Sequence, residues 1–551
     1  MSDSEATPLL RPNSSPSPNR KLQGAFAREP VDGETYRSGE DDVNGETYDN
    51  VPKTKRELGL FSSAFLIFNG IVGAGIYATP SVILRASGSV GMSLVFWVLG
   101  AIFASAATAV FIELGTGLPR SGSHKNYLEY IYQRPKFLVT CLFSVFAAFV
   151  ISVAANGVIV GEYLTHALNI QQNVTNARLF AVLALTLAFL AHGISVRVGL
   201  RLQNLLGTFV LVLLLCIAIS GGLSILKFPG FEGGDGGKNF QLDRIWEGTS
   251  LRANGLVTGL YAIMWSYNGY ASANAALSEV RDPVKTLKRA APLALVAVTA
   301  LYLLVNIAYF VVIPKNEIMD SKRVVVALFA RHLFGEVAER IVSALVAISV
   351  FGNMLATTFM YSRLIQELGR EGVLPAPGWF SSNKPFGTPF AALFWQWLVC
   401  CVTATAPPPG DAFNFIMNLS QYRWTITGTA ISAGVLVLDN PWLSRTISNQ
   451  AKLKWNWEPP FRAWTSAKLF FFLSNVFLFV VPLVPPVEGF VVYEHLPYWM
   501  HVAVCFLIFF VGWLYWYLRW RLLPRRSGYT LDRVVIEDDG ITRREFVKFY
   551  N

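Results

Sequence analysis

Long apolar runs constrain this chain more than any other feature of its sequence. A run of about 20 apolar residues is long enough to cross the hydrocarbon core of a bilayer as a helix. The chain is 53% hydrophobic and only 15% charged. Twelve apolar runs stand out: 59–84, 91–118, 137–168, 178–195, 201–226, 251–278, 290–313, 337–368, 389–406, 411–437, 466–485 and 495–523. The sequence therefore predicts an all-α integral membrane protein with twelve transmembrane helices.

The predicted helical region, residues 59–523, lies between two polar tails. Residues 1–58 contain no apolar run and are rich in Ser, Pro, Gly and acidic residues, so we expect a disordered N-terminal tail. Residues 524–551 form the predicted C-terminal tail. The acidic stretch from Glu40 to Asp49 has two interpretations: a solvated tail, or a docking patch for trafficking and ubiquitination machinery that removes the protein from the membrane.

Basic residues mark alternate connections between the predicted spans. Lys and Arg cluster in every second connection: 120–136, 197–201, 281–289, 370–384 and 445–462. Three intervening connections hold only Arg178 between them: 169–178, 407–411 and 486–494. Short cytoplasmic loops carry the excess of Lys and Arg in membrane proteins. With an even number of spans, both tails are predicted to be cytoplasmic. The same distribution explains the net charge of +10 without a nucleic-acid partner.

Two of the predicted spans contain a glycine-broken segment. Residues 69–76 read NGIVGAGI, and residues 265–270 read WSYNGY. Clustered glycine weakens a helix, and a break at membrane depth is tolerated only where it lines a cavity. Interrupted helices at matching positions of two halves point to the substrate site of a secondary transporter.

The chemistry of such breaks predicts the ligand. The half-helix after Gly75 presents N–H groups and a positive dipole end, which suit a carboxylate. Freed carbonyls at Ile71 and around Trp265 to Asn268 suit an ammonium group. A site with both properties suits a zwitterion, so an α-amino acid is the predicted ligand. The alternative is that the glycines only let helices pack closely, which we favour less because there are two such segments.

Other function classes find less support in the sequence. The five cysteines all fall in predicted spans and the six histidines are scattered, so we expect neither a metal site nor an extracellular disulfide. We expect no cofactor and no enzyme activity, because no catalytic grouping or nucleotide-binding loop fits its structural context. No filter motif of a channel is present. A nutrient sensor built on a transporter fold remains the main alternative, although such sensors usually carry longer tails.

Several motifs resemble those of one superfamily of transporters. They are Gly73-Ala74-Gly75-Ile76 with Pro80, ELGTGLPRSG from Glu113 to Gly122, NYLEY from Asn126 to Tyr130, RPKF from Arg134 to Phe137, Ser362-Arg363, and REGVLP from Arg370 to Pro375. Between residues 57 and 440 the chain resembles the amino acid–polyamine–organocation superfamily. Within it, the chain is similar to the L-type and fungal high-affinity methionine permease branch. The resemblance implies a five-plus-five inverted repeat with two extra C-terminal helices.

The resemblance also implies roles for particular residues. In similar transporters the first break binds the substrate carboxylate, which points here to Ala74 and Gly75 beside Gly73. The amine goes to carbonyls that correspond to Ile71, Trp265 and Asn268, with Ser266 in the same segment. An aromatic residue at the position of Trp265 acts as an outer gate, and Trp predicts a tighter pocket than the Phe common in the family. Two further polar residues either line the pocket or hydrogen-bond between helices: Asn156 and Asn353.

Three departures from the family qualify this picture. Some bacterial relatives carry a coupling lysine in the fifth span. No lysine lies in the fifth predicted span of this chain, so proton coupling would need another carrier. Glu113 and Glu162 are the candidates because ionisable groups near membrane depth are rare, and His192 is a weaker one. Residues 169–178 contain no cysteine, so a disulfide-linked heavy chain is not expected. Arg423, near the middle of the tenth predicted span, either pairs with a buried carboxylate or faces the transport pathway.

These features together predict a permease that moves neutral L-amino acids, with methionine as a candidate, by alternating access. The implied partners are the amino acid, the lipid bilayer and protons as a candidate coupling ion. The predicted location is the plasma membrane, with a vacuolar or endosomal membrane as the alternative. An amino acid sensor that transports weakly or not at all is the alternative function.

Overall fold

The computed structural model describes residues 58–550 apart from short gaps, at 119–122, 172, 232–234, 251, 276, 278–279, 322, 409, 441–456, 487–490 and 539–540. The predicted N-terminal tail falls outside the described residues except for Leu58. Contacts group Asp49–Asn551 into one unit, which contains every helix and strand discussed below.

The described residues are mostly helical. The first half of the chain forms α2 (Leu60–Ile71), α3 (Gly75–Ala78), α4 (Pro80–Ser87), α5 (Val90–Gly117), α6 (His124–Ile131), α7 (Leu138–Phe149), α8 (Val153–Ala167), α9 (Val174–Ile194), α10 (Val196–Ile225), η3 (Asp235–Phe240), α11 (Ala253–Ser266) and α12 (Ser272–Ala275). The second half forms α13 (Pro283–Val312), α14 (Lys315–Asp320), α15 (Val325–Phe334), α16 (Glu336–Arg370), α17 (Pro377–Ser381), α18 (Phe390–Thr405), α19 (Ala412–Asp439), α21 (Thr465–Val480), η5 (Val481–Leu483), α22 (Met500–Tyr517), η6 (Leu518–Leu522) and α23 (Leu523–Ser527).

Local sequence explains several helix boundaries. Ser89 precedes α5 and its side chain accepts a hydrogen bond from Met92 N, which satisfies a backbone group that lacks an intrahelical partner. Asn173 does the same for α9, accepting from Asn176 N. Gly88 ends α4 with a φ of 76°, a backbone conformation that favours glycine.

Nine helical segments among the described residues are long and apolar enough to cross a membrane: Leu60–Ala78, Val90–Gly117, Leu138–Ala167, Val174–Ile194, Arg201–Ile225, Pro283–Val312, Glu336–Arg370, Thr465–Leu483 and Met500–Ser527. The three other predicted spans coincide with helices that are divided, short or partly polar. The span over 251–278 is divided into α11 and α12, α18 has only 16 residues, and α19 carries Asn418, Gln421 and Arg423. The helical membrane class is therefore confirmed, whereas the count of twelve and the inverted repeat remain predictions.

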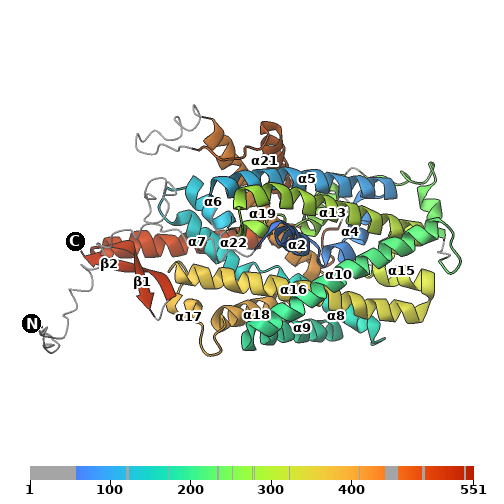
Figure 1. Cartoon of the computed structure of the whole chain (residues 1–551), viewed down its shortest axis with the longest axis horizontal. Helices are drawn as coiled ribbons and strands as arrows, with labels where there is room; N and C mark the ends of the chain where they lie inside the picture. Colours follow the sequence, from blue (N-terminus) through green and yellow to red (C-terminus); the bar gives the residue numbers. More distant parts are fainter. Residues whose placement is uncertain are drawn as a thin grey trace, which may run out of the picture. The chain divides into compact units, whose positions relative to one another are not determined.

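Two local features differ from the sequence-based expectation. The helix predicted over 137–168 is interrupted between Phe149 and Val153, although no glycine or proline marks that point. The expectation of an all-α chain is wrong at the C-terminus, where β1 (Tyr529–Asp538) and β2 (Ile541–Tyr550) pair as an antiparallel hairpin. The two residues between these strands are Asp and Gly in the sequence, a pair favoured in two-residue hairpin turns. Figure 1 shows this hairpin in red beyond the end of α22.

Helix α13 organises the packing around the interrupted helices. It contacts α2, α5 and α10, and Figure 1 shows α5 and α13 running side by side. The second interrupted helix, α11, packs against α4 and α5, while α8 packs against α9 and α16. These contacts bury the two glycine-broken segments inside the bundle.

Candidate functional site

The first glycine-broken segment interrupts its helix as predicted. Helix α2 ends at Ile71, and Val72 adopts an extended conformation with φ −74° and ψ 107°. The chain becomes helical again at Gly75, the first residue of α3. Val72 and Ala74 are both almost fully buried. The backbone groups freed by this interruption therefore lie inside the protein and not in bulk water.

The second glycine-broken segment also interrupts its helix. Helix α11 ends at Ser266, and α12 begins at Ser272. Gly269 lies between them with a φ of 131°, and a Cβ on it would come within 2.2 Å of Gly70 O. A Cβ on Gly70 would in turn come within 2.3 Å of Ser272 Oγ. The two interruptions are therefore in direct contact, and glycine is what permits this approach.

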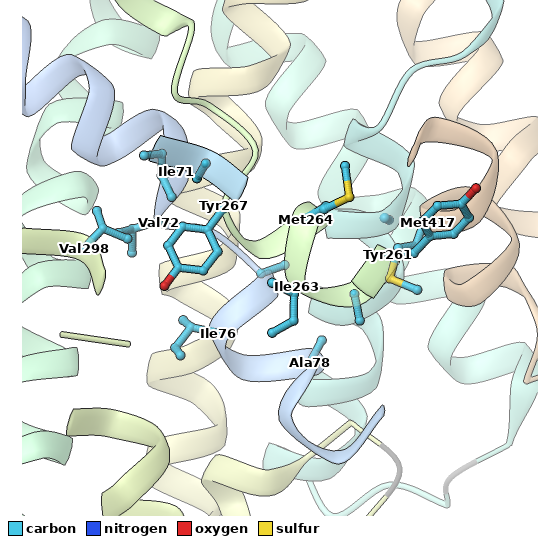
Figure 2. Packing of buried hydrophobic residues seen from close by; sticks show 14 of the residues in the cluster. Ile71, Val72, Ile76, Ala78, Tyr261, Ile263, Met264, Tyr267, Val298 and Met417 are labelled. Carbon is cyan, nitrogen blue, oxygen red and sulfur yellow. The ribbon is translucent and has the colours of Figure 1, made fainter. Parts of the chain in front are cut away.

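A second contact joins the interruptions one turn away. A Cβ on Gly75 would lie 2.7 Å from both Cα and Oγ of Ser266. Thr79 Oγ1 lies 2.8 Å from Gly75 O and 2.9 Å from Ser266 Oγ. Figure 2 shows Ile71 and Val72 of the first segment next to Tyr267 of the second.

Tyr302 bridges the two interrupted helices from α13. Its hydroxyl lies 3.1 Å from Ile71 O and 3.0 Å from Ser266 O, the carbonyls at the ends of α2 and α11. The single hydroxyl proton is shared between these two acceptors. The ring is fully buried and packs edge-on against Trp97 and Tyr267, at centroid distances of 5.3 and 5.4 Å. Sequence reasoning missed Tyr302, although a tyrosine inside a long apolar helix signals a buried hydroxyl that needs a partner.

Asn353 of α16 satisfies further carbonyls of the first interruption. Its side-chain nitrogen donates to Val72 O at 3.2 Å and to Asn69 O at 3.4 Å. Asn156 of α8 donates in turn to Asn353 Oδ1 at 3.0 Å. A Cβ on Gly73 would lie 2.8 Å from the Asn353 side chain. Both asparagines therefore make the interhelical hydrogen bonds that the sequence offered as one alternative, directly beside the first interruption.

Backbone N–H groups at the first interruption lack partners. Within the described part of the chain, the N–H groups of Gly73, Ala74, Gly75 and Ile76 donate no hydrogen bond. All four residues are buried. Unpaired buried N–H groups are rare in proteins because each costs free energy comparable to a lost hydrogen bond. Four consecutive examples form a cradle for an anion.

The carbonyls predicted for an ammonium group are engaged to different degrees. Tyr302 occupies the Ile71 carbonyl. Trp265 O accepts from Asn268 N at 3.2 Å and also faces the N–H of Tyr267, so it is already engaged. Asn268 O accepts no hydrogen bond from any described residue. Of the predicted carbonyls, only that of Asn268 is therefore free.

The ring of Trp265 begins a chain of contacts that runs through Phe413 and Arg323 to Glu162. The Trp265 ring lies 6.3 Å from the ring of Phe413 in an edge-on geometry. The guanidinium group of Arg323 lies 5.5 Å from the centroid of the Phe413 ring. Arg323 also donates two hydrogen bonds to the carboxylate of Glu162, one of them 2.8 Å long from Nε. Tyr163 donates to Arg323 O at 3.0 Å. Trp265 is therefore connected through aromatic and ionic contacts to α8 and α19.

The two acidic residues singled out by the sequence are both paired. Glu113 is fully buried; Lys468 lies 2.7 Å from its Oε2, and Trp457 and Ala463 N donate to it. Glu162 pairs with Arg323. Because a buried ion pair must be broken to change the charge of either partner, Glu113 acts here as a structural anchor between α5 and α21.

Arg423 lacks an acidic partner among the described residues. It is only 3% exposed, donates to Tyr361 Oη at 3.3 Å and lies 4.1 Å from the Trp424 ring centroid. Its Nε has no hydrogen-bond partner. The described residues therefore do not support a salt bridge to a buried carboxylate. His192, the weaker proton-carrier candidate, instead lies 3.0 Å from the carbonyl of Leu355 through Nε2.

A multi-pass helical bundle with two interrupted helices in contact is the architecture typical of a membrane transporter. The family model described as "Amino acid permease" matches residues 58–511, and the chain belongs to this family. It is 40% identical over 499 residues to the high-affinity methionine permease of Saccharomyces cerevisiae, covering 90% of this chain and 85% of that protein. It is 26% identical over 503 residues to the low-affinity methionine permease of the same yeast, covering 90% and 88%. The human b(0,+)-type amino acid transporter 1 is 28% identical over 396 residues, covering 70% and 77%.

Proposed function

We propose that this chain transports neutral L-amino acids by alternating access and holds the substrate as a zwitterion between the two interruptions. The carboxylate binds the N–H groups around Ala74 and Gly75. The ammonium group binds the carbonyls of Trp265 and Asn268, and that of Ile71 when Tyr302 releases it. The observation that carries this proposal is the row of four unpaired, buried N–H groups at the first interruption, together with an Asn268 carbonyl that accepts no hydrogen bond from a described residue.

The neighbouring side chains favour a neutral substrate. Glu113 shares Lys468 with Asp439, and Glu162 pairs with Arg323, so both carboxylates are engaged by cations of the protein and not open to a substrate side chain. Trp265 and Phe413 present aromatic surface instead. A charged substrate side chain buried there without a partner would cost several kcal/mol. Methionine fits this environment, and the names of two relatives point to the same amino acid.

We also infer how the protein sits in its membrane. The clustering of Lys and Arg in alternate connections supports cytoplasmic tails, and the plasma membrane remains the proposed location. No disulfide-linked heavy chain is proposed. Protons are the proposed coupling ion, and Glu162 is the more accessible candidate carrier, because its side chain is 23% exposed whereas that of Glu113 is 0% exposed.

Uptake by the purified full chain tests the proposal. In proteoliposomes, labelled L-methionine should accumulate, and an excess of unlabelled neutral amino acids should compete, whereas lysine and glutamate should not. Protein-free liposomes are the control. Saturable methionine binding without any flux would overturn transport in favour of a sensor, and no binding of any amino acid would overturn the site itself.

Substitution of Gly75 tests the carboxylate cradle separately. We expect Gly75→Val to abolish methionine binding, because its Cβ would lie 2.7 Å from Ser266 and cover the N–H groups. Gly222→Val is the matched control, since no atom lies within 4 Å of a Cβ at that position. Both variants should reach the membrane at similar levels. Unchanged methionine affinity in Gly75→Val would remove this segment from the site.

A further inference from the structure

The last membrane helix is longer than a bilayer requires. Helices α22, η6 and α23 form one continuous segment, Met500–Ser527, of 28 residues. At 1.5 Å per residue this is about 42 Å, roughly 12 Å more than a hydrocarbon core of about 30 Å. Aromatic residues crowd its second half: Trp513, Tyr515, Trp516, Tyr517 and Trp520. Because Trp and Tyr concentrate where a helix leaves the membrane, residues beyond 517 lie at the level of the lipid headgroups.

Arginines follow directly after this aromatic belt. Arg519 is engaged by the protein, donating to Gly372 O at 3.1 Å and lying 5.0 Å from the Trp520 ring centroid. Arg521, Arg525 and Arg526 are exposed, and none of them forms an ion pair with a described residue, although Arg521 lies 5.7 Å from the Trp516 ring centroid. Their guanidinium groups are therefore available to an external anion.

A neighbouring loop adds two more basic side chains. Trp516 Nε1 donates to Lys136 O at 2.9 Å, which fixes the loop between α6 and α7 beside the end of α22. Both Lys136 and Arg134 are exposed. Together with the three exposed arginines they form a cluster that we call the inner basic patch: Arg134, Lys136, Arg521, Arg525 and Arg526.

We propose that the inner basic patch binds the phosphate groups of anionic phospholipids in the adjoining leaflet. Two exposed leucines alternate with the arginines, Leu518 at 40% and Leu523 at 48%. This combination of apolar and cationic side chains suits a lipid, whose tail and headgroup are joined, better than a free phosphate ion. Clusters of Lys and Arg immediately beyond a membrane helix attract anionic lipid in this way.

The same region is tied to a helix of the transport core. Tyr515 donates to Val373 O at 2.8 Å, and Arg519 reaches the carbonyls of Gly372 and Leu374 just after α16 ends. Helix α16 also carries Asn353, which contacts the first interruption. A lipid bound at the inner basic patch would thus stabilise the end of a helix that supports the site. The proposal stands independently of the transported substrate.

Binding of a defined lipid to the purified full chain tests this proposal. In neutral detergent, added phosphatidylserine should raise the unfolding midpoint, and phosphatidylcholine or inorganic phosphate should not. The triple variant Arg521→Gln, Arg525→Gln, Arg526→Gln should need at least about tenfold more phosphatidylserine for the same shift. Replacing the same three arginines by lysine should retain the shift of the unfolding midpoint, because the lipid recognises their positive charge.

A matched control places the same changes at the other end of the bundle. Three exposed arginines serve for this control. Arg340 lies near the start of α16, and Arg244 and Arg252 lie in the connection before α11. Their replacement by glutamine should leave the phosphatidylserine response unchanged. The proposal is overturned if the patch variant responds as the wild type does, or if both triple variants lose the response equally. A shift with inorganic phosphate alone would assign the patch to a free anion instead.

Discussion

Replacing Tyr302 by phenylalanine should weaken the connection between the two interrupted helices. The ring would keep its contacts with Trp97 and Tyr267, but the carbonyls of Ile71 and Ser266 would lose their shared donor. A buried acceptor left without its partner costs about 1–3 kcal/mol, and hydrogen bonds inside membranes average less, so we expect about 1–2 kcal/mol. This corresponds to roughly a 5–30-fold change in the equilibrium that holds the segments together.

Thermal unfolding and methionine uptake measure this effect. Tyr302→Phe should lower the unfolding midpoint and raise the methionine concentration needed for half-maximal uptake. Tyr309→Phe is the matched control two turns further along α13, because that hydroxyl is fully buried and has no partner among the described residues. Tyr309→Phe should neither lower the unfolding midpoint nor raise the methionine concentration needed for half-maximal uptake. Equal behaviour of the two variants would refute the bridging role of Tyr302.

Three other substitutions test the surroundings of the site. Trp265→Ala should weaken methionine binding by up to about 3 kcal/mol, because part of the apolar contact disappears; unchanged kinetics for every neutral amino acid would remove Trp265 from the pocket. Arg423→Met should preserve or raise the unfolding midpoint, since it removes a buried charge without an acidic partner, and should alter substrate preference or ion dependence; a destabilised variant with normal transport would instead indicate a paired arginine. Glu162→Gln should lower the midpoint by leaving a buried cation unpaired, and adding Arg323→Met should restore it; no effect of the single change would contradict a stabilising pair.

The interruptions could be located from sequence because their cause is local. The three glycines in 69–76 and the single Gly269 in 265–270 weaken a helix wherever the rest of the chain lies, and both helices do end within these segments. The contact between the two segments needed tertiary structure. Nothing in the sequence says that Gly70 would meet Gly269, or that Gly75 would meet Ser266.

Partners from distant parts of the chain were beyond sequence reasoning. Glu113 stands out in the sequence as an ionisable residue near membrane depth, but its partner Lys468, which it shares with Asp439, lies far away in sequence. Tyr302 was missed for the same reason, because its role depends on carbonyls of two other helices. The C-terminal hairpin was not predicted, although the sequence between its strands is Asp-Gly, a pair favoured in two-residue hairpin turns.

Competition by methionine derivatives tests the central claim most directly, because it alters the ligand and leaves the protein intact. Binding at the two interruptions requires both charged groups of the substrate. The carboxylate binds the N–H groups near Gly75, and the ammonium group binds the carbonyls near Asn268. Unlabelled L-methionine should therefore block uptake of labelled methionine, whereas its methyl ester and its N-acetyl derivative should each compete at least about a hundredfold less well, as expected when a buried charged group loses its partner. Equal competition by either derivative would contradict recognition of a zwitterion at the two interruptions.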